Sequence, residues 1–257
     1  MSYKELINAF FTIFNKEVYR YMRLWKQTLL PPIITMALYY AIFGNLIGPR
    51  IGEMQGHDYM SFIVPGLVML SIITGSYGNV VSSFYGNKFQ GSLDEILVSP
   101  TPSIIIFLGF CTSSALRGIV VGIIVTLVSL FFTELRIYNI WAVLLVACLT
   151  SFMFAAMGLV NAIYANSFDD VTIVPNFILT PLTYLGGIFY SIELLPEFWQ
   201  KASLLNPILY MVNAFRYGIL GVSDIPIFYA YAIIVFFTLI LSAICIYLLD
   251  KGIGIRT

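Results

Sequence analysis

Charged residues are scarce in this sequence. Only 10% of its 257 residues are Asp, Glu, Lys or Arg, and 60% are hydrophobic. Soluble domains contain roughly 25% charged and 45–50% apolar residues. So few charges cannot cover the surface of a water-soluble fold, whereas a bilayer favours apolar side chains on the outside of a protein. With a mean hydropathy of +0.91, the composition excludes an ordinary soluble fold and indicates an integral membrane protein.

Residues suited to metal, redox or nucleophilic chemistry are equally scarce. His57 is the only histidine, and we interpret it as a solvated loop residue. The three cysteines, Cys111, Cys148 and Cys245, lie in apolar runs without a C-x-x-C spacing, which predicts free thiols rather than a disulfide or a metal site. The phosphate-binding pattern G-x-x-x-x-G-K-[ST] is absent. We therefore expect no catalytic, cofactor-binding or metal-binding residues, so energy for any active process must come from another polypeptide or an ion gradient.

Long apolar runs predict helices that cross the membrane, since a crossing takes about 20 apolar residues. The fifth run contains Pro175, Pro181 and the Gly186-Gly187 pair, which are tolerated where neighbouring helices satisfy the freed backbone groups. The fold class predicted is an all-α integral membrane protein with six transmembrane helices and a single domain over residues 1–257. The six runs are 28–48, 61–83, 103–132, 140–165, 171–190 and 227–249.

The distribution of Lys and Arg predicts the orientation of the chain. Six crossings place both ends on one side, and that side carries most of the basic residues. The prediction is that both termini are cytoplasmic, with the bundle over residues 28–249 and a cytoplasmic tail over 250–257. The basic residues on the cytoplasmic side are Lys4, Lys16, Arg20, Arg23, Lys26, Lys88, Lys251 and Arg256, against Arg50, Arg136, Lys201 and Arg216 on the other.

Residues 1–27 have the pattern of an amphipathic helix. Lys16, Arg20 and Arg23 share one face, which predicts a helix in the cytoplasmic interface, in contact with membrane lipids. The alternative is a helix packed on the protein itself; we favour the interface because a spanning segment follows directly. Apolar residues recur at three- and four-residue steps at Leu6, Ile7, Phe10, Phe11, Phe14, Val18, Met22 and Trp25.

The loop after the second run predicts a short cytoplasmic helix. Ser92 and Glu95 have the spacing of a capping box, and Asp94 suits the positive end of the helix dipole. The leucines and the isoleucine give one apolar face, and Pro100 ends the helix. That face either packs on its own bundle or on lipid headgroups, or it docks a cytoplasmic partner, and the pattern favours neither. The helix comprises Ser92, Leu93, Asp94, Glu95, Ile96 and Leu97.

The loop between the fifth and sixth runs is unusually apolar. Residues 206–220 are too short to cross the bilayer and contain Arg216, which is typical of a re-entrant or interfacial segment. Trp199 fits the aromatic belt at the membrane surface. We predict a re-entrant outer hairpin, because an ordinary surface loop of this composition would expose a large apolar patch.

Arg117 is an intramembrane charge near the middle of the third run. An arginine at this depth costs about 2.5–3.5 kcal/mol on insertion scales. It either faces the bundle interior or a dimer interface, where Gly118 and Gly122 allow close helix contact, or it snorkels to the membrane surface because the segment is displaced. Both interpretations stay open at this point.

Several motifs together resemble the type 2 ABC transporter permeases. Residues 91–100, GSLDEILVSP, are similar to the coupling helix that follows the second span of these exporters. Further matches follow in the order of the family signature, and the resemblance covers essentially the whole chain. They are Pro181-Leu182, Gly186-Gly187, Leu195-Pro196, Asn206-Pro207 and Arg216-Tyr217-Gly218.

The resemblance implies the membrane-spanning subunit of an ATP-binding-cassette exporter, similar to the small permeases of the bacterial inner membrane. It implies a homodimer with two copies of a separate ABC ATPase, which would hold ATP and Mg²⁺, and no nucleic-acid partner. Residues 92–97 would dock the ATPase. Capsule and O-antigen exporters share the architecture, so a polysaccharide or glycolipid exporter is an alternative. The residues implied in an outer gate are Leu195, Pro196, Trp199, Asn206, Pro207 and Arg216.

Two other functions compete with the exporter. A secondary transporter needs carboxylates within its spans to carry protons or bind cations, and the six runs contain essentially none. A channel or non-transporting scaffold leaves the short cytoplasmic helix without a purpose. Dependence on an ATPase would separate the exporter from both.

Overall fold

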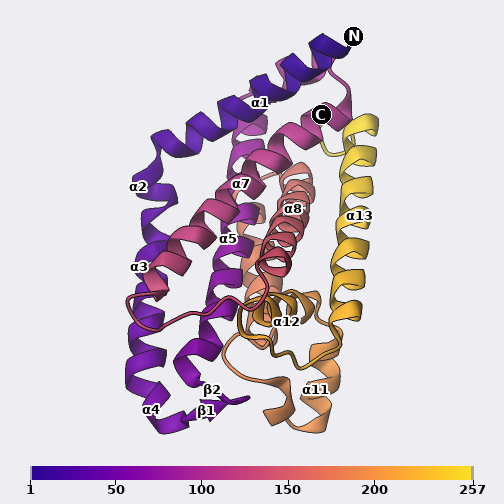
Figure 1. The fold of residues 1–257 in the computed structure, drawn as a ribbon. Coiled ribbons are helices and arrows are strands. Elements are labelled where there is room, and N and C mark those ends of the chain that lie inside the picture. Colours follow the sequence, from indigo (N-terminus) through magenta and orange to yellow (C-terminus); the bar gives the residue numbers. More distant parts are fainter. Residues whose placement is uncertain (1, 256–257) are drawn as a thin grey trace.

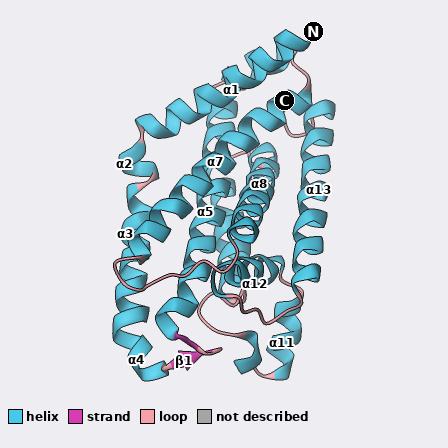
Figure 2. Ribbon diagram, viewed as in Figure 1, coloured by secondary structure: helices cyan, strands magenta, loops and turns pink. Residues whose placement is uncertain are grey.

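The fold is helical almost throughout, in a computed structural model that describes residues 2–255 (Figure 2). Five helical stretches in the described chain are long and apolar enough to cross a membrane, which confirms an all-α integral membrane protein. Their ends differ by a few residues from those of the predicted runs. They are Trp25–Ile51, Tyr59–Phe89, Ser103–Ser129, Ile140–Tyr164 and Ile227–Lys251.

The N-terminal helix α1 (Tyr3–Arg23) lies obliquely across one end of the bundle, where the N and C labels of Figure 1 both lie. A capping box between Ser2 and Glu5 begins it. The chain then descends through the first spanning stretch to a two-stranded antiparallel hairpin at the opposite end. This stretch consists of α2 (Trp25–Thr28), α3 (Leu30–Tyr39), a π-helical turn (Tyr40–Ile47) and α4 (Gly48–Ile51), and the hairpin of β1 (Glu53–Met54) and β2 (His57–Asp58).

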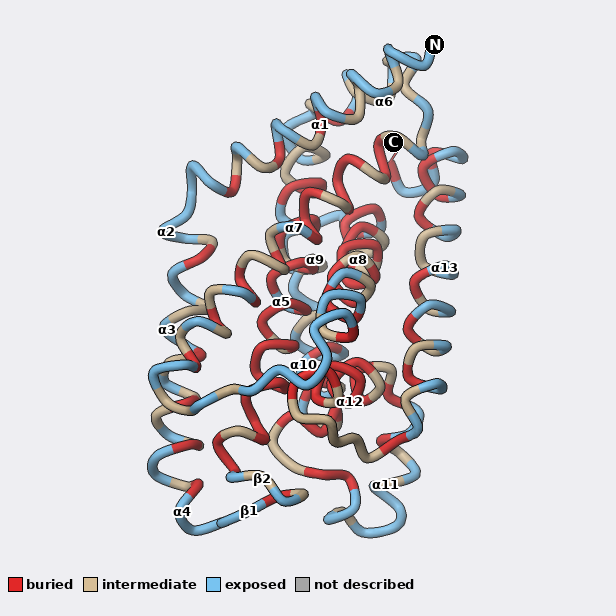
Figure 3. Tube along the Cα trace, in the orientation of Figure 1, coloured by how far each residue is buried: buried red, intermediate tan, exposed pale blue. Residues whose placement is uncertain are grey.

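Helix α5 (Tyr59–Phe89) is the centre of the bundle and is buried over most of its length (Figure 3). Helices α7 (Ser103–Ser129) and α8 (Ile140–Tyr164) pack against it, and the short α6 (Ser92–Val98) follows it at the end that carries the termini. Glycines permit these close contacts. A Cβ at Gly118 of α7 would lie 2.8 Å from the Ile72 carbonyl oxygen, and one at Gly158 of α8 would lie 2.8 Å from that of Tyr77.

The fifth predicted run, 171–190, does not form one long helix. A continuous but irregular helical run begins with α9 (Phe168–Ile173), passes through a π-helical turn (Val174–Leu179) and ends with α10 (Thr180–Tyr184). Pro175 and Pro181 lie at the first turn of the second and third pieces. Because proline has no N–H to donate, it interrupts the regular hydrogen-bond ladder there.

The remaining elements return the chain to the end where it began. After a turn at Gly187, where φ is +68° and glycine is favoured, a short 3-10 turn (Ile192–Leu194) leads to three helices. Helix α12 lies among α5, α8 and α13, and α13 runs along the edge of the bundle (Figure 1). The three helices are α11 (Glu197–Leu204), α12 (Pro207–Leu220) and α13 (Ile227–Lys251).

The close contact between α5 and α7 gives a stability prediction. In Gly118→Ala, the new methyl group would overlap the Ser76 hydroxyl and press on the Ile72 carbonyl, so we expect a loss of about 1–3 kcal/mol. The matched control is Gly78→Ala in α5, where a Cβ meets nothing within 4 Å. Thermal unfolding midpoints in one detergent should fall for Gly118→Ala only; equal midpoints for the two variants would contradict this packing.

Candidate functional site

Helix α6 begins differently from the predicted capping box. Its N-cap is Gly91, whose φ of +75° lies in the left-handed region, and Ser92 is already inside the helix. The Ser92 hydroxyl donates back to Asn87 of α5, at 3.0 Å from Oδ1. The Ser92–Glu95 capping box is therefore wrong, because Gly91 makes the turn and the serine hydroxyl ties α6 to α5 instead.

The apolar face of α6 rests on the protein itself. Leu93 is 1% exposed and belongs to the hydrophobic core, and Ile96 and Leu97 are half-buried against the same core. Asp94 and Glu95 point outward. Val98, beyond the predicted limit of the helix, is 85% exposed. Of the alternatives predicted for the apolar face of α6, packing on its own bundle is therefore the one observed. The surface that stays accessible to a partner is the opposite face, with Asp94, Glu95 and Val98.

Helix α1 also packs on the bundle through one face. Ile13 lies over Gly109 of α7, and Glu17 and Tyr21 are buried beside it. The aromatic residues Phe11 and Trp25 remain exposed at the same end. One face of the helix therefore packs on the protein through three residues spaced four apart, as in the alternative interpretation, and contact of its exposed face with membrane lipids stays a prediction.

A buried carboxylate that the sequence did not suggest anchors α1. Glu17 accepts a short hydrogen bond from the Ser83 hydroxyl of α5 and forms an ion pair with Arg20, whose Nε lies 3.1 Å from its Oε2. Arg20 Nη2 in turn donates to the Oδ1 of Asn79 at 2.9 Å. Arg20 is therefore turned toward the bundle rather than sharing an outward basic face, because its ion pair with a buried carboxylate holds it there.

Arg117 reaches the interior from α7. Its Nη2 donates to the Thr28 carbonyl oxygen at 2.9 Å, and its Nη1 lies 3.4 Å from Asn79 Oδ1. Asn79 also donates through Nδ2 to Ser114 at 2.8 Å. The buried amide of Asn79 thus contacts Arg20 of α1 and two residues of α7. Of the two positions left open for Arg117, its contacts with Asn79 and Thr28 correspond to the one that faces the bundle, with the side chain half-buried.

At the opposite end, α12 is held by its first residues. Asn206 caps the helix, accepting from the Ile208 N–H at 3.0 Å, and its Nδ2 donates to the Leu182 carbonyl at 2.6 Å. Pro207 occupies the first helical position, where its missing N–H costs nothing. Most of α12 is buried in the bundle. Leu195 and Pro196 lead into α11, in which Trp199 is exposed.

Arg216 of α12 is fully buried. Its Nη2 donates to the Gly187 carbonyl oxygen at 2.5 Å, and its Nη1 lies 3.8 Å from Asp224 Oδ2. The guanidinium carbon stands 4.0 Å from the centre of the Phe62 ring of α5, a cation–π contact. The arginine thus links α12 to α5 and to the turn after α10.

Asp224 completes this outer network and was missed in the sequence. It accepts from the Ser191 hydroxyl at 2.5 Å and, by a short hydrogen bond, from the Gln55 amide between the two strands. The only available signal was a carboxylate eight residues after Arg216, across the turn at Gly221. That spacing is too common to identify an ion pair without the fold.

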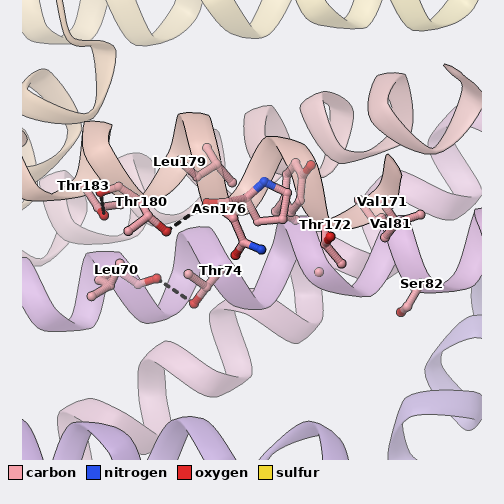
Figure 4. A pocket seen from close by; sticks show the side chains of 13 residues that line it. Leu70, Thr74, Val81, Ser82, Val171, Thr172, Asn176, Leu179, Thr180 and Thr183 are labelled. Carbon is pink, nitrogen blue, oxygen red and sulfur yellow. Dashed lines mark hydrogen bonds between the residues drawn. The ribbon is translucent and has the colours of Figure 1, made fainter. Parts of the chain in front are cut away.

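A groove of about 280 Å³ lies between α5 and the irregular run of α9, the π-helical turn and α10. Figure 4 shows that its polar side chains come from both walls, with Thr74 on α5 facing Asn176 and Thr180. Sequence reasoning did not find this groove because its residues are spread over two segments. The polar lining residues are Thr74, Ser82, Thr172, Asn176, Thr180 and Thr183.

The buried ion pair gives a second stability prediction. Arg216→Met leaves Asp224 buried without its cation, which should cost about 3–5 kcal/mol. Lys201→Ala provides the control, because Lys201 pairs with Glu197 on the exposed surface of α11, where such pairs contribute about 0–1 kcal/mol. Chemical unfolding in detergent should separate the two variants clearly. Equal losses would show that the Arg216 network carries no special stability.

Comparison with known proteins agrees with this architecture. Residues 8–220 match the model of the family described as ABC-2 type transporter. The inner membrane transport permease YadH of Escherichia coli (strain K12) is 51% identical, over 96% of each chain. Nodulation protein J of Neorhizobium galegae is 26% identical over 87% of this chain and 84% of that protein, and that of Rhizobium meliloti (strain 1021) is 24% identical over 77% of each. The resemblance to type 2 ABC permeases is therefore confirmed, and the chain belongs to the ABC-2 type transporter family as a transmembrane permease.

Proposed function

We propose that this permease forms the translocation pathway of an ATP-driven exporter in the bacterial inner membrane, as a homodimer coupled to two copies of a separate ABC ATPase. The groove between α5 and residues 168–184 carries this proposal (Figure 4). Most of its lining is apolar, and hydroxyl and amide groups from both walls are interspersed in it. The groove is open along one side, which a second copy of the chain would cover to complete the path.

The proposed topology has six crossings, with residues 168–184 as the irregular fifth. Both termini lie at the same end in Figure 1, as an even number of crossings requires. The basic residues of α1 support a cytoplasmic location for that end. The opposite end would then be the outer one, where α12 enters the bundle as a re-entrant helix.

The coupling step of the proposal follows from the way α6 is attached. Leu93 is held in the core and Ser92 is bonded to α5, so a force on α6 is transmitted to α5. ATP binding would close the two ATPases and displace both α6 helices. Because α5 forms one wall of the groove, its displacement would change the width of the pathway.

The outer network would act as a gate in this cycle. Arg216 joins α12 to the turn after α10 and to α5, so the outer end cannot open without separating some of these contacts. The other side of the proposed gate consists of Leu195-Pro196, which precede α11, and Asn206-Pro207, which begin α12. The proposed gate comprises Leu195, Pro196, Trp199, Asn206, Pro207 and Arg216, with Asp224 as the partner of the arginine.

The placement of α6 predicts which variants lose the ATPase. Val98→Asp, or Asp94→Lys combined with Glu95→Lys, alters the exposed face and should reduce the amount of co-purifying ATPase at least about tenfold without lowering the unfolding midpoint. Leu93→Asp should instead destabilise the permease, because it places a charge in the core. Glu193→Lys, exposed at the opposite end, serves as the control. A stable permease without any ATPase partner in mild detergent would overturn the proposed function.

The groove predicts a labelling pattern. In a variant lacking Cys111, Cys148 and Cys245, Thr74→Cys should react with a water-soluble maleimide, because Thr74 lines the open groove. Ser71→Cys, one turn earlier on α5, should stay unreactive because Ser71 is fully buried. Adding ATP to the complete transporter should change the rate at position 74. A rate at position 74 as low as that at position 71 would argue against a water-accessible pathway here.

A further inference from the structure

A second cavity lies at the end of the molecule opposite to the termini. It has a volume of about 420 Å³ and opens between strand β2, the first turn of α5, the end of α12 and residues 130–139, the loop from α7 to α8. We call it the loop cavity, because this loop supplies half of its lining. The polar side chains that line it are His57, Ser61, Glu134, Arg136 and Tyr138.

The loop cavity contains charges of both signs that do not neutralise each other. Glu134 and Arg136 are two residues apart and exposed, yet neither belongs to an ion pair within residues 2–255. His57, half-buried on β2, is a further nitrogen donor in the same cavity. A carboxylate and a guanidinium that share a cavity without pairing can each bind the opposite charge of one zwitterionic ligand.

The frame of the loop cavity is held by contacts between its walls. The Tyr138 N–H donates to the Ile219 carbonyl oxygen of α12 at 3.0 Å, and the hydroxyls of Ser61 and Thr133 are hydrogen-bonded at 2.8 Å. The Tyr138 ring also packs edge-on against Tyr217, with ring centres 5.6 Å apart. These contacts fix the loop to α5 and to α12, so the cavity is formed before a ligand binds.

The surroundings of the loop cavity place it at the membrane surface. The loop joins the ends of two spanning helices and is exposed beside α12 (Figure 3). Tyr138 is 65% exposed and Trp141, in the first turn of α8, is 77% exposed. Such side chains concentrate at the level of the lipid headgroups. Further along α8, the exposed side chain of Leu144 is apolar and suits contact with acyl chains.

We infer that the loop cavity binds the headgroup of a zwitterionic phospholipid that carries a primary ammonium group, as in phosphatidylethanolamine. Arg136 and His57 donate to the phosphate, and Glu134 accepts from the ammonium. The apolar lining residue Ile137 lies beside the start of the acyl chains. This lipid site goes beyond the proposed exporter function and requires neither an ATPase nor a particular leaflet.

The charges of the loop cavity also distinguish this headgroup from the other common ones. An anionic headgroup without an ammonium would leave Glu134 unpaired beside a new negative charge, and Asp58 next to His57 is exposed as well. A choline headgroup has a positive charge but no N–H, so it cannot donate to Glu134. A primary ammonium has three donors and can therefore form a charge-assisted hydrogen bond with this carboxylate.

The test measures lipid binding to the purified permease. After removal of endogenous lipid in detergent, the protein is titrated with ethanolamine, choline and glycerol phospholipids of identical acyl chains, and bound molecules are counted by native mass spectrometry. We expect one ethanolamine lipid per chain to bind at least about tenfold more tightly than either other lipid. Glu134→Gln should remove this preference, and Arg136→Gln should weaken binding of the ethanolamine and choline lipids alike.

Matched controls are Glu197→Gln and Lys201→Gln, which alter an exposed charge pair on α11 and should leave lipid binding unchanged. Equal affinity for ethanolamine and choline lipids, a preference that survives Glu134→Gln, or tighter binding of the glycerol lipid would overturn the inference. Glycerophosphoethanolamine, the same headgroup without acyl chains, should compete only weakly. Competition at concentrations equal to those of the lipid would assign the cavity to a soluble zwitterion instead. None of these results bears on the ATPase, so the exporter proposal is tested separately.

Discussion

The rest of the bundle depends on how closely α7 and α8 approach α5. Within lipid, helices gain little from hydrophobic burial, so they associate through close packing and hydrogen bonds. Glycine at positions 118 and 158 removes the side chains that would keep these helices apart, and at position 66 it admits the backbone of Ile188 beside α5. Because the backbones meet, short polar side chains such as Asn79 and Ser114 reach each other across the contact.

Two buried charge networks lie toward opposite ends of α5. At the end with the termini, Arg20 and Arg117 share the amide of Asn79, and at the other end Arg216 stands over Phe62. Each network joins α5 to segments distant in the sequence. A buried charge is costly unless its partners stay in place, so each network favours one arrangement of its segments.

Composition and run length were sufficient to predict the helical membrane fold, because lipid imposes both requirements on any spanning segment. They were insufficient wherever a local signal competed with tertiary contacts. Ser92 has the spacing of a cap, yet the left-handed turn at Gly91 places it inside α6. The fifth run is apolar enough to span, yet Pro175 and Pro181 break its regularity. Burial of Leu93 could not be predicted either, because an amphipathic pattern does not say which surface covers the apolar face.

That burial changes what docking on α6 can achieve. Helix α6 has seven residues, and its apolar face is packed on its own bundle. Only two carboxylates and the side chain of Val98 remain for contact with a partner. Exposed charge pairs contribute little in water, so the exposed face of α6 alone would bind a partner only weakly. Phe89 and Phe168 supply apolar area next to it, on the helix that α6 follows and on the one that begins the irregular fifth segment. These two segments are also the walls of the groove, so the aromatic pair joins the two walls at the end of the molecule that carries the termini.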